Sequence, residues 1–175
     1  TSDDHRIVVA VDNTFLGPIL QRPLELGADL NIYSATKYIG GHSDLVAGAV
    51  SGESEAMAKV FEYRTFLGGM ADPHTSWMLA RSMETLAIRV ERQSRSARKV
   101  LDHLQKSPGI PVKGINKIFS AWAEDLAGSG DFKSAGIAQE QQVNGGGMFA
   151  MELPGGRKAA FAFLDSLQHF KLAVS

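Results

Sequence analysis

The segment "IYSATKYIGGHSDLVAGAV" (residues 32–50) places one lysine, Lys37, between hydroxyl residues and a pair of glycines. Apolar residues lie on both sides, and "LNIYSA" (30–35) has the composition of a buried strand that ends just before the lysine. A solvated surface lysine needs no such surroundings. The pattern therefore places Lys37 beyond the end of a strand, where functional side chains lie in α/β folds.

Strands and helical segments alternate along this half of the chain. "IVVAV" (7–11) is an unbroken, β-branched run that stops at Asp12, as expected of a central parallel strand covered on both faces. "LVAGAV" (45–50) predicts a further strand, and residues 55–67 predict a helix. Such alternation favours an α/β layer architecture.

The clearest predicted helix starts at Asp72, which can cap it, with Pro73 in its first position. Apolar residues recur at helical spacing as far as Leu104. The helix would exceed the roughly 8 to 20 residues typical of globular proteins, so we expect it to bend or to join two compact units. We place a domain boundary near residue 85. After a polar, glycine-containing region, "GGGMFAMELPGG" (145–156) predicts a strand and residues 157–170 predict a helix.

Composition narrows the class of protein. The 175 residues include 18 Lys plus Arg and 19 Asp plus Glu, which give a formal charge of −1 and no basic field for nucleic acid or an anionic membrane. No apolar run approaches the roughly 20 residues that cross a bilayer. Cysteine is absent, which excludes disulfides and thiol catalysis from this segment. The composition predicts a soluble cytoplasmic protein that binds a small molecule or another protein, with no nucleic-acid or membrane partner.

The chemistry available to Lys37 depends on its neighbours. Partial burial helps a lysine to lose its proton, and the free amine can form a Schiff base with a substrate carbonyl or with pyridoxal phosphate. Pyridoxal phosphate needs donors for its phosphate and a carboxylate that keeps its ring nitrogen protonated. Ser34 and Thr36 share one face of an extended segment and can supply hydroxyls. Asp12 can supply the carboxylate, and it emerges at the same sheet edge as Lys37 if the two strands are neighbours.

Other interpretations of these residues stay open. A lysine after a strand is commonly solvated, Ser and Thr there often form turns, and Asp12 can form an Asx turn. Asp12, His42, Asp44 and His74 could serve a metal-dependent hydrolase, but their spacing matches no compact ligand motif, and we predict no metal site. A third possibility is a non-catalytic fragment that acts as an interaction or structural module and tolerates the loss of Lys37.

Longer motifs narrow the choice between these interpretations. They are "VDNTF" (11–15), "QRPLELGAD" (21–29), "SATKYIGGHSD" (34–44), "DPHTSWMLARSMETLAIRVERQ" (72–93), "GGMFAMEL" (146–153) and "LQHFKLAVS" (167–175). Together they closely resemble the transsulfuration enzymes, the pyridoxal-phosphate (PLP) family that includes cystathionine γ-synthase, cystathionine β- and γ-lyases, and methionine γ-lyase. The resemblance covers most of the chain and is weakest between about residues 108 and 143.

The resemblance implies a fold and a division into domains. The fold is the PLP-dependent transferase fold of aspartate aminotransferase, fold type I, with a mostly parallel sheet and flanking helices. Residues 1–85 would form the C-terminal half of the large PLP-binding domain. Residues 86–175 would form the interdomain helix and the start of a smaller α+β C-terminal domain. Family members are longer than this chain, so we expect it to be a fragment with weak cofactor binding and little turnover by itself.

The resemblance also implies roles for residues. Lys37 would hold PLP as an internal aldimine and then transfer protons, and Asp12 would pair with the pyridine nitrogen. Ser34 and Thr36 would bind the phosphate, and Ser175 would help to hold the substrate α-carboxylate. The implied activity is γ-elimination or γ-replacement on cystathionine, methionine or an acylated homoserine, within sulfur amino-acid metabolism.

A basic run lies on the predicted long helix. It consists of Arg89, Arg92, Arg95, Arg98 and Lys99. Three-residue spacing on a helix usually indicates a solvated face. The resembling enzymes are homotetramers whose active sites are shared between protomers, so this run could instead contact another subunit.

Overall fold

The computed structural model describes residues 7–106, 115, 117–122 and 132–173. The chain divides into two compact units, unit 1 (Thr1–Val90) and unit 2 (Glu91–Ser175). Unit 1 contains β1 (Ala10–Asp12), α1 (Gly17–Leu20), β2 (Leu30–Ser34), β3 (Gly48–Gly52), α2 (Ser54–Leu67), α3 (Pro73–Met83) and the first turn of α4 (Leu86–Lys106). Unit 2 contains the remainder of α4, β4 (Lys117–Ser120), α5 (Phe132–Gln141), β5 (Phe149–Glu152) and α6 (Gly156–Ser166). Within these described ranges, no helix combines the length and apolar character needed to cross a bilayer.

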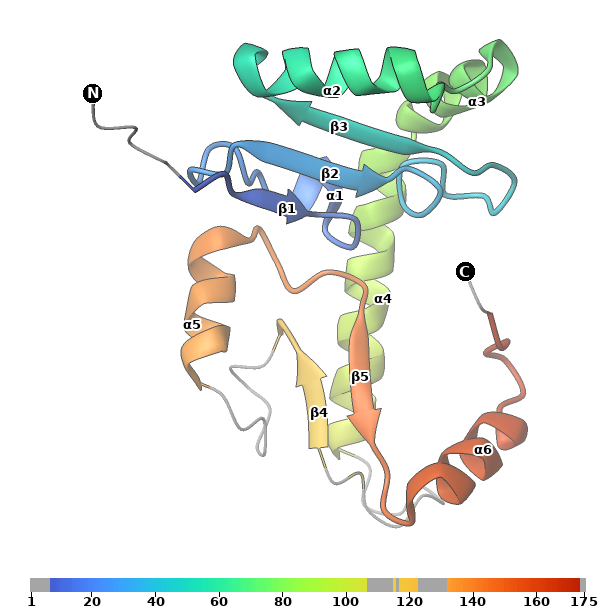
Figure 1. Cartoon of the computed structure of the whole chain (residues 1–175). Helices are drawn as coiled ribbons and strands as arrows, with labels where there is room; N and C mark the ends of the chain where they lie inside the picture. Colours follow the sequence, from blue (N-terminus) through green and yellow to red (C-terminus); the bar gives the residue numbers. More distant parts are fainter. Residues whose placement is uncertain (1–6, 107–114, 116, 123–131, 174–175) are drawn as a thin grey trace. The chain divides into compact units, whose positions relative to one another are not determined.

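The sheet of unit 1 has the strand order β1-β2-β3 (Figure 1). β1 and β2 run parallel, with Asp12 opposite Ile32, which confirms that the strands before Asp12 and Lys37 are neighbours. β2 and β3 are antiparallel, so this described sheet is mixed, where the resemblance implies a mostly parallel one. The reason lies in the connection: parallel neighbours need a crossover that is usually helical, and residues 35–47 contain turns and a bend but no helix.

The strands also begin later than the apolar runs predict. Ile7 and Val8 are 83% and 64% exposed, so this part of the run is not covered on both faces, and it lies before β1, which is an edge strand of the described sheet. β3 begins at Gly48, not at residue 45. Leu45 is instead buried, and its side chain lies 3.1 Å from the position that a β-carbon on Gly40 would take.

The predicted long helix is two helices. Asp72 caps α3 as the sequence predicts, accepting hydrogen bonds from the backbone N–H groups of His74 (2.9 Å) and Thr75 (3.1 Å). The helix is interrupted at residues 84–85, where the N–H of Thr85 donates to the Ser82 carbonyl (3.3 Å) in a three-residue turn. The bend that the sequence predicts in this helix is therefore a break between α3 and α4. The assignment of domains on either side of residue 85 stays a prediction.

The core of unit 1 joins the first turn of α4 to the segment after Lys37. Leu20, Leu86 and Val90 form a buried cluster, and Tyr38 and Ile39 pack against it. Burial raises the pKa of the Tyr38 phenol. The chain that carries Lys37 is therefore attached to α4 by apolar contacts.

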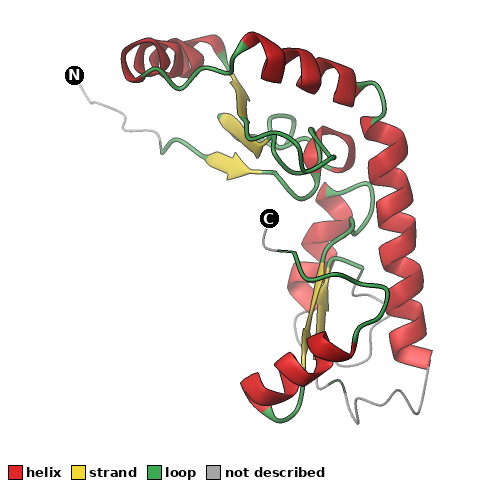
Figure 2. Ribbon diagram, turned by 90° about the vertical axis from the view of Figure 1, so that its right-hand side faces the viewer, coloured by secondary structure: helices red, strands yellow, loops and turns green. Residues whose placement is uncertain are grey.

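In unit 2, β4 and β5 pair antiparallel and lie alongside each other (Figure 2). β5 and α6 confirm the strand and the helix predicted between residues 145 and 170, although α6 ends at Ser166. β4 and α5 were not predicted, because β4 is a run of only four residues and α5 contains Gly136 in a sequence without clear periodicity.

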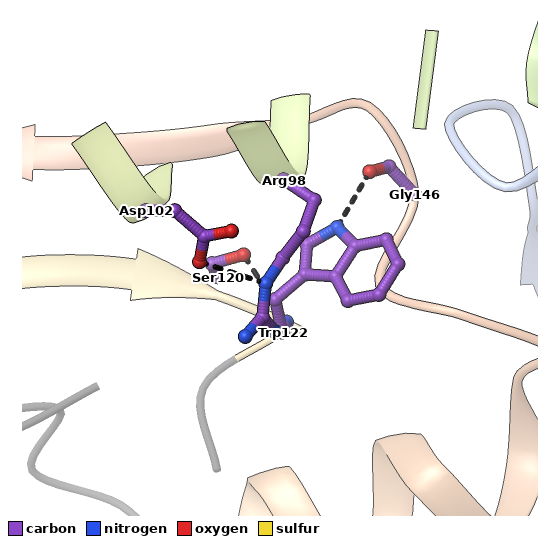
Figure 3. A network of polar contacts seen from close by, with 5 residues as sticks. All are labelled: Arg98, Asp102, Ser120, Trp122 and Gly146. Carbon is purple, nitrogen blue, oxygen red and sulfur yellow. Dashed lines mark hydrogen bonds and ion pairs between the residues drawn. The ribbon is translucent and has the colours of Figure 1, made fainter. Parts of the chain in front are cut away.

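Trp122 organises the polar contacts of unit 2 (Figure 3). Its indole N–H donates to the Gly146 carbonyl (2.9 Å), and the guanidinium of Arg98 lies 5.4 Å from the ring centre. Arg98 also pairs with Asp102 at 3.0 Å. The predicted solvated face of the basic run is therefore wrong for Arg98, which is half-buried, although Arg92 and Arg95 are exposed.

Candidate active site

Asp12 lies at the carboxyl end of β1, and its conformation is fixed by Thr14. The Thr14 hydroxyl donates to Asp12 Oδ1 at 2.5 Å, and the Thr14 backbone N–H donates to the same oxygen at 3.0 Å. This is the Asx turn that the sequence allows. In the described part of the chain, Asp12 Oδ2 has no hydrogen bond or ion pair, and the residue is exposed.

These contacts set the charge of Asp12. The hydroxyl of Thr14, followed by its backbone N–H, lowers the pKa of the Asp12 carboxyl by stabilising its ionised form. Asp12 is therefore a carboxylate at neutral pH, with Oδ1 held by the turn and Oδ2 without a hydrogen bond among the described residues.

Thr14 also connects Asp12 to the strand that precedes Lys37. Its hydroxyl oxygen accepts a hydrogen bond from the Ser34 backbone N–H at 2.8 Å. Asn13 supports the same junction, because its N–H donates to the Ile32 carbonyl at 2.9 Å. These hydrogen bonds connect the carboxyl ends of β1 and β2 beyond their last paired residues. Asp12 lies at the end of β1 and Lys37 follows the end of β2, as the sequence predicts.

Ser34 and Thr36 differ in their contacts. Ser34 ends β2, and no hydrogen bond is formed by its hydroxyl within the described residues. The Thr36 hydroxyl donates to the Ala47 carbonyl (3.2 Å) and accepts from the Ala47 N–H (3.0 Å). Thr36 could donate to another group only if its hydroxyl rotated away from Ala47.

Lys37 lies in the turns that follow β2. Its N–H donates to the Ser34 carbonyl (3.1 Å), and its carbonyl accepts from the Gly41 N–H (2.7 Å). Gly41 has a φ of +73°, which favours glycine, so the chain turns here as the glycine pair predicts. Lys37 is half-buried.

Two further sets of candidate residues come from the sequence. Ser175 lies outside the described residues. The hydrolase alternative needs a ligand cluster, and no group of three His, Cys, Asp or Glu side chains within the described ranges could hold a metal ion. A hollow of about 710 Å³ between α2 and β3 is lined by residues that include Tyr33 and Phe61, but by none of the four candidates Asp12, Ser34, Thr36 and Lys37.

Comparison with known proteins settles the family. A family profile described as Cys/Met metabolism PLP-dependent enzyme matches residues 1–175. The chain belongs to this PLP-dependent family. The resemblance found in its sequence motifs is thereby confirmed.

Individual relatives support the same family assignment. The cystathionine β-lyase of Lactococcus lactis subsp. cremoris is 37% identical over 172 residues, which cover 98% of this chain and 42% of the relative. The L-methionine γ-lyase of Pseudomonas deceptionensis is 37% identical over 171 residues, 97% of this chain and 40% of the relative. The crystal structure of cystathionine γ-synthase from Xanthomonas oryzae pv. oryzae, in complex with aminoacrylate and cysteine, has a TM-score of 0.82 at 35% identity and covers 96% of this chain and 41% of that chain.

Two conclusions follow for this member of the Cys/Met family. The chain spans about two-fifths of the length of these relatives. Its α/β fold is confirmed, and its structural neighbours are cystathionine γ-synthase and methionine γ-lyase.

The structure adds Thr14 and Arg89 to the residues found from the sequence. Thr14 lies inside the quoted motif "VDNTF". A hydroxyl two residues after a carboxylate is the sequence pattern that could have predicted its contact with Asp12. Arg89 was assigned to a solvated face, which is wrong, because it is half-buried and donates to the carbonyls of Tyr38 (2.8 Å) and Ile39 (3.2 Å). No local pattern reveals a contact across 50 residues.

Replacing Thr14 by valine tests its effect on Asp12. Thr14 is buried, and valine has nearly its shape, so the change removes the hydroxyl and leaves the Ser34 N–H without an acceptor. We expect a loss of about 1–3 kcal/mol in the free energy of unfolding. We also expect the pKa of Asp12 to rise towards its ordinary value, measured by NMR titration of the carboxyl carbon.

The contribution of Asp12 to folding stability depends on pH in a defined direction. A carboxyl whose pKa is lowered by folding contributes stability above its unfolded pKa, and that contribution is lost as the pH falls through the folded value. The valine variant should therefore lose less stability than the wild type between neutral and strongly acidic pH. Thr14→Ser keeps the hydroxyl and serves as the control. An unchanged Asp12 titration in the valine variant would show that the hydroxyl does not set this pKa.

Proposed function

We propose that the protein carrying this chain is a PLP-dependent carbon–sulfur lyase or transferase of sulfur amino-acid metabolism. Its substrates would be cystathionine, methionine or an acylated homoserine, through γ-elimination or γ-replacement. The observation that carries the proposal is the pairing of β1 and β2, which puts the ionised Asp12 and the segment leading to Lys37 at one sheet edge. This is the constellation that the family's cofactor requires.

The residues present fit PLP. Asp12 offers a carboxylate oxygen, Oδ2, that forms no hydrogen bond or ion pair with the described residues, which suits a protonated ring nitrogen. Ser34 offers a hydroxyl for the phosphate. Thr36 is the less suitable donor, because its hydroxyl is bonded on both sides to Ala47. When bound, PLP supplies an electron-withdrawing ring that stabilises negative charge on the substrate α-carbon.

The chain's own residues have separate tasks in this proposal. Lys37 would hold the cofactor through Nζ, and the same nitrogen, when free, would accept the substrate α-proton as a general base. Asp12 would hold the proton on the ring nitrogen, and Thr14 favours the ionised form of Asp12. Ser34 would orient the phosphate, together with Thr36 if the Thr36 hydroxyl rotated away from Ala47. Ser175 would contribute to the site for the substrate carboxylate.

The remaining proposals follow the family. Residues 1–85 would belong to the large PLP-binding domain, and residues 86–175 to the interdomain helix and the C-terminal domain. The protein would act in the cytoplasm as a homotetramer. The oligomer is tested by light scattering of the wild type and of a charge-reversal variant at Arg92 and Arg95, both of which are exposed on α4.

Reductive trapping tests the assignment of the cofactor lysine. PLP is added to the protein that carries this sequence, the visible absorbance band is recorded, and the bound cofactor is fixed with borohydride. Peptide mass spectrometry should then find the reduced cofactor on Lys37 and not on exposed lysines such as Lys59. Absence of both the band and the adduct would favour the non-catalytic interaction module.

Product analysis separates the possible reactions. The relatives include proteins named cystathionine β-lyase and L-methionine γ-lyase, so cleavage at either carbon deserves a direct measurement. Cystathionine cleaved at the γ-position yields 2-oxobutanoate, and β-cleavage yields pyruvate. Formation of pyruvate alone would overturn the γ-specific part of the proposal and leave the carbon–sulfur lyase intact.

A further inference from the structure

Arg89, in the first turn of α4, binds the segment that follows Lys37. Its Nη1 donates to the Tyr38 carbonyl at 2.8 Å, and its Nη2 donates to the Ile39 carbonyl at 3.2 Å. The same Nη2 donates to the Ser82 carbonyl at the end of α3 (2.9 Å). One planar guanidinium thus joins the lysine segment to the break between the two helices.

These carbonyls lie outside the regular structure. Residues 35–40 form turns, and their internal hydrogen bonds use the carbonyls of Ala35 and Lys37, which accept from Gly40 and Gly41 at 2.7 Å each. The carbonyls of Tyr38 and Ile39 obtain donors from Arg89 instead. Hydrogen bonds from a charged donor are stronger than neutral ones, so the guanidinium restricts the turn immediately after Lys37.

Gly41 provides the space for this contact. A β-carbon built on Gly41 would overlap Nη1 and Cζ of Arg89, and the positive φ of Gly41 also disfavours a side chain. The guanidinium is partly desolvated, which lowers the pKa of Arg89, yet arginine stays charged in proteins. A charged group is thus held in a gap that the second glycine of the pair leaves open.

Apolar packing supports the same attachment. Leu86 and Val90 flank Arg89 on α4 and are buried, at 5% and 2% exposure, in the cluster that Tyr38 and Ile39 contact. The side chains of the turn therefore pack on the helix, while its carbonyls bind the guanidinium. Both sets of contacts fix the residues next to Lys37.

We propose that Arg89 is a positioning residue for Lys37: by holding the Tyr38–Gly41 turn through Tyr38 and Ile39, it fixes the direction of the lysine amine towards the cofactor. This inference rests on the proposed function, in which Lys37 carries PLP. Arg89 itself touches neither cofactor nor substrate in this proposal. Loss of its guanidinium should therefore weaken PLP binding and lower kcat, with little change in KM.

The test uses Arg89→Met, which keeps much of the apolar stem, and Arg89→Lys, which keeps the charge but cannot reach two carbonyls with one planar group. Arg81→Met is the control, since Arg81 is an exposed arginine in the last turn of α3. PLP is titrated into each apo-protein by its visible absorbance, and visible circular dichroism is recorded at saturation. We expect the methionine variant to raise the Kd for PLP about tenfold or more and to reduce the dichroism, with the lysine variant intermediate and the control unchanged.

Amide hydrogen exchange of the apo-proteins provides a readout that needs no cofactor. The N–H groups of Gly40 and Gly41 should exchange about tenfold faster in Arg89→Met than in the wild type. Unchanged exchange together with an unchanged Kd would overturn the inference. If the wild type forms no adduct on Lys37, the proposed function fails, while faster exchange would still show that Arg89 holds the turn.

Gly41→Ala tests the contact from its other side, and it covers the case in which the methionine variant does not fold. The new methyl group should displace the guanidinium and raise the Kd for PLP in the same direction. Both changes act on one contact, so their effects on the Kd for PLP should not multiply. The double variant Gly41→Ala/Arg89→Met should raise the Kd by less than the product of the two single increases. Effects that multiply independently would contradict a shared contact.

Discussion

Replacement of Lys37 by alanine is expected to abolish the visible band of bound PLP and to reduce turnover by at least about 10³-fold, because one nitrogen both attaches the cofactor and moves the substrate proton. The fold should be retained, since Lys37 is only half-buried and its backbone hydrogen bonds, to Ser34 and from Gly41, do not need its side chain. Absorbance, steady-state turnover and the thermal midpoint measure these three effects.

Two controls make this result specific. Lys59→Ala removes an exposed lysine on α2 and should leave the band and the turnover unchanged. Small primary amines added to Lys37→Ala should restore part of the proton transfer, because they supply a base where the side chain was. A Lys37→Ala protein that keeps the band and the turnover would assign the cofactor to another lysine.

The sequence predicted well which residues lie at the carboxyl ends of the first two strands, because the signals for these strand ends are local. A β-branched run that ends in Asp12, and a second strand that ends before Lys37, suffice to place both residues at one edge once the strands are parallel neighbours. The cap at Asp72 is local in the same way, since its partners are two and three residues away.

The remaining features depend on contacts between distant segments. Arg89 has the spacing of a solvated basic face, and only the path of the chain brings its guanidinium to Tyr38. The antiparallel direction of β3 also has no local signal, because the run 45–50 would suit either direction. Thr36 is a third case, since the sequence shows a hydroxyl but not that Ala47 already occupies it.

Asp12→Asn is the second replacement for which we expect a large effect, a fall in turnover of about 10²-fold or more with the fold preserved. The amide keeps an oxygen that can accept from the Thr14 hydroxyl and N–H, so the Asx turn should persist. The variant lacks the negative charge that keeps the ring nitrogen protonated, so the ring withdraws electrons less well and the substrate α-proton becomes harder to remove. Turnover at saturating substrate and PLP measures the loss.

The lowered pKa of Asp12 predicts how this loss depends on pH. The wild-type carboxylate stays ionised from alkaline pH down to its lowered folded pKa, so the difference between Asp12→Asn and the wild type should be constant across neutral pH and shrink only when strong acid protonates Asp12. Asp44→Asn, an exposed change in the loop between β2 and β3, should have wild-type turnover throughout. Asp12→Glu restores the charge on a longer stem and should recover part of the activity. Wild-type turnover in Asp12→Asn would show that another group protonates the ring, and it would remove Asp12 from the proposed site.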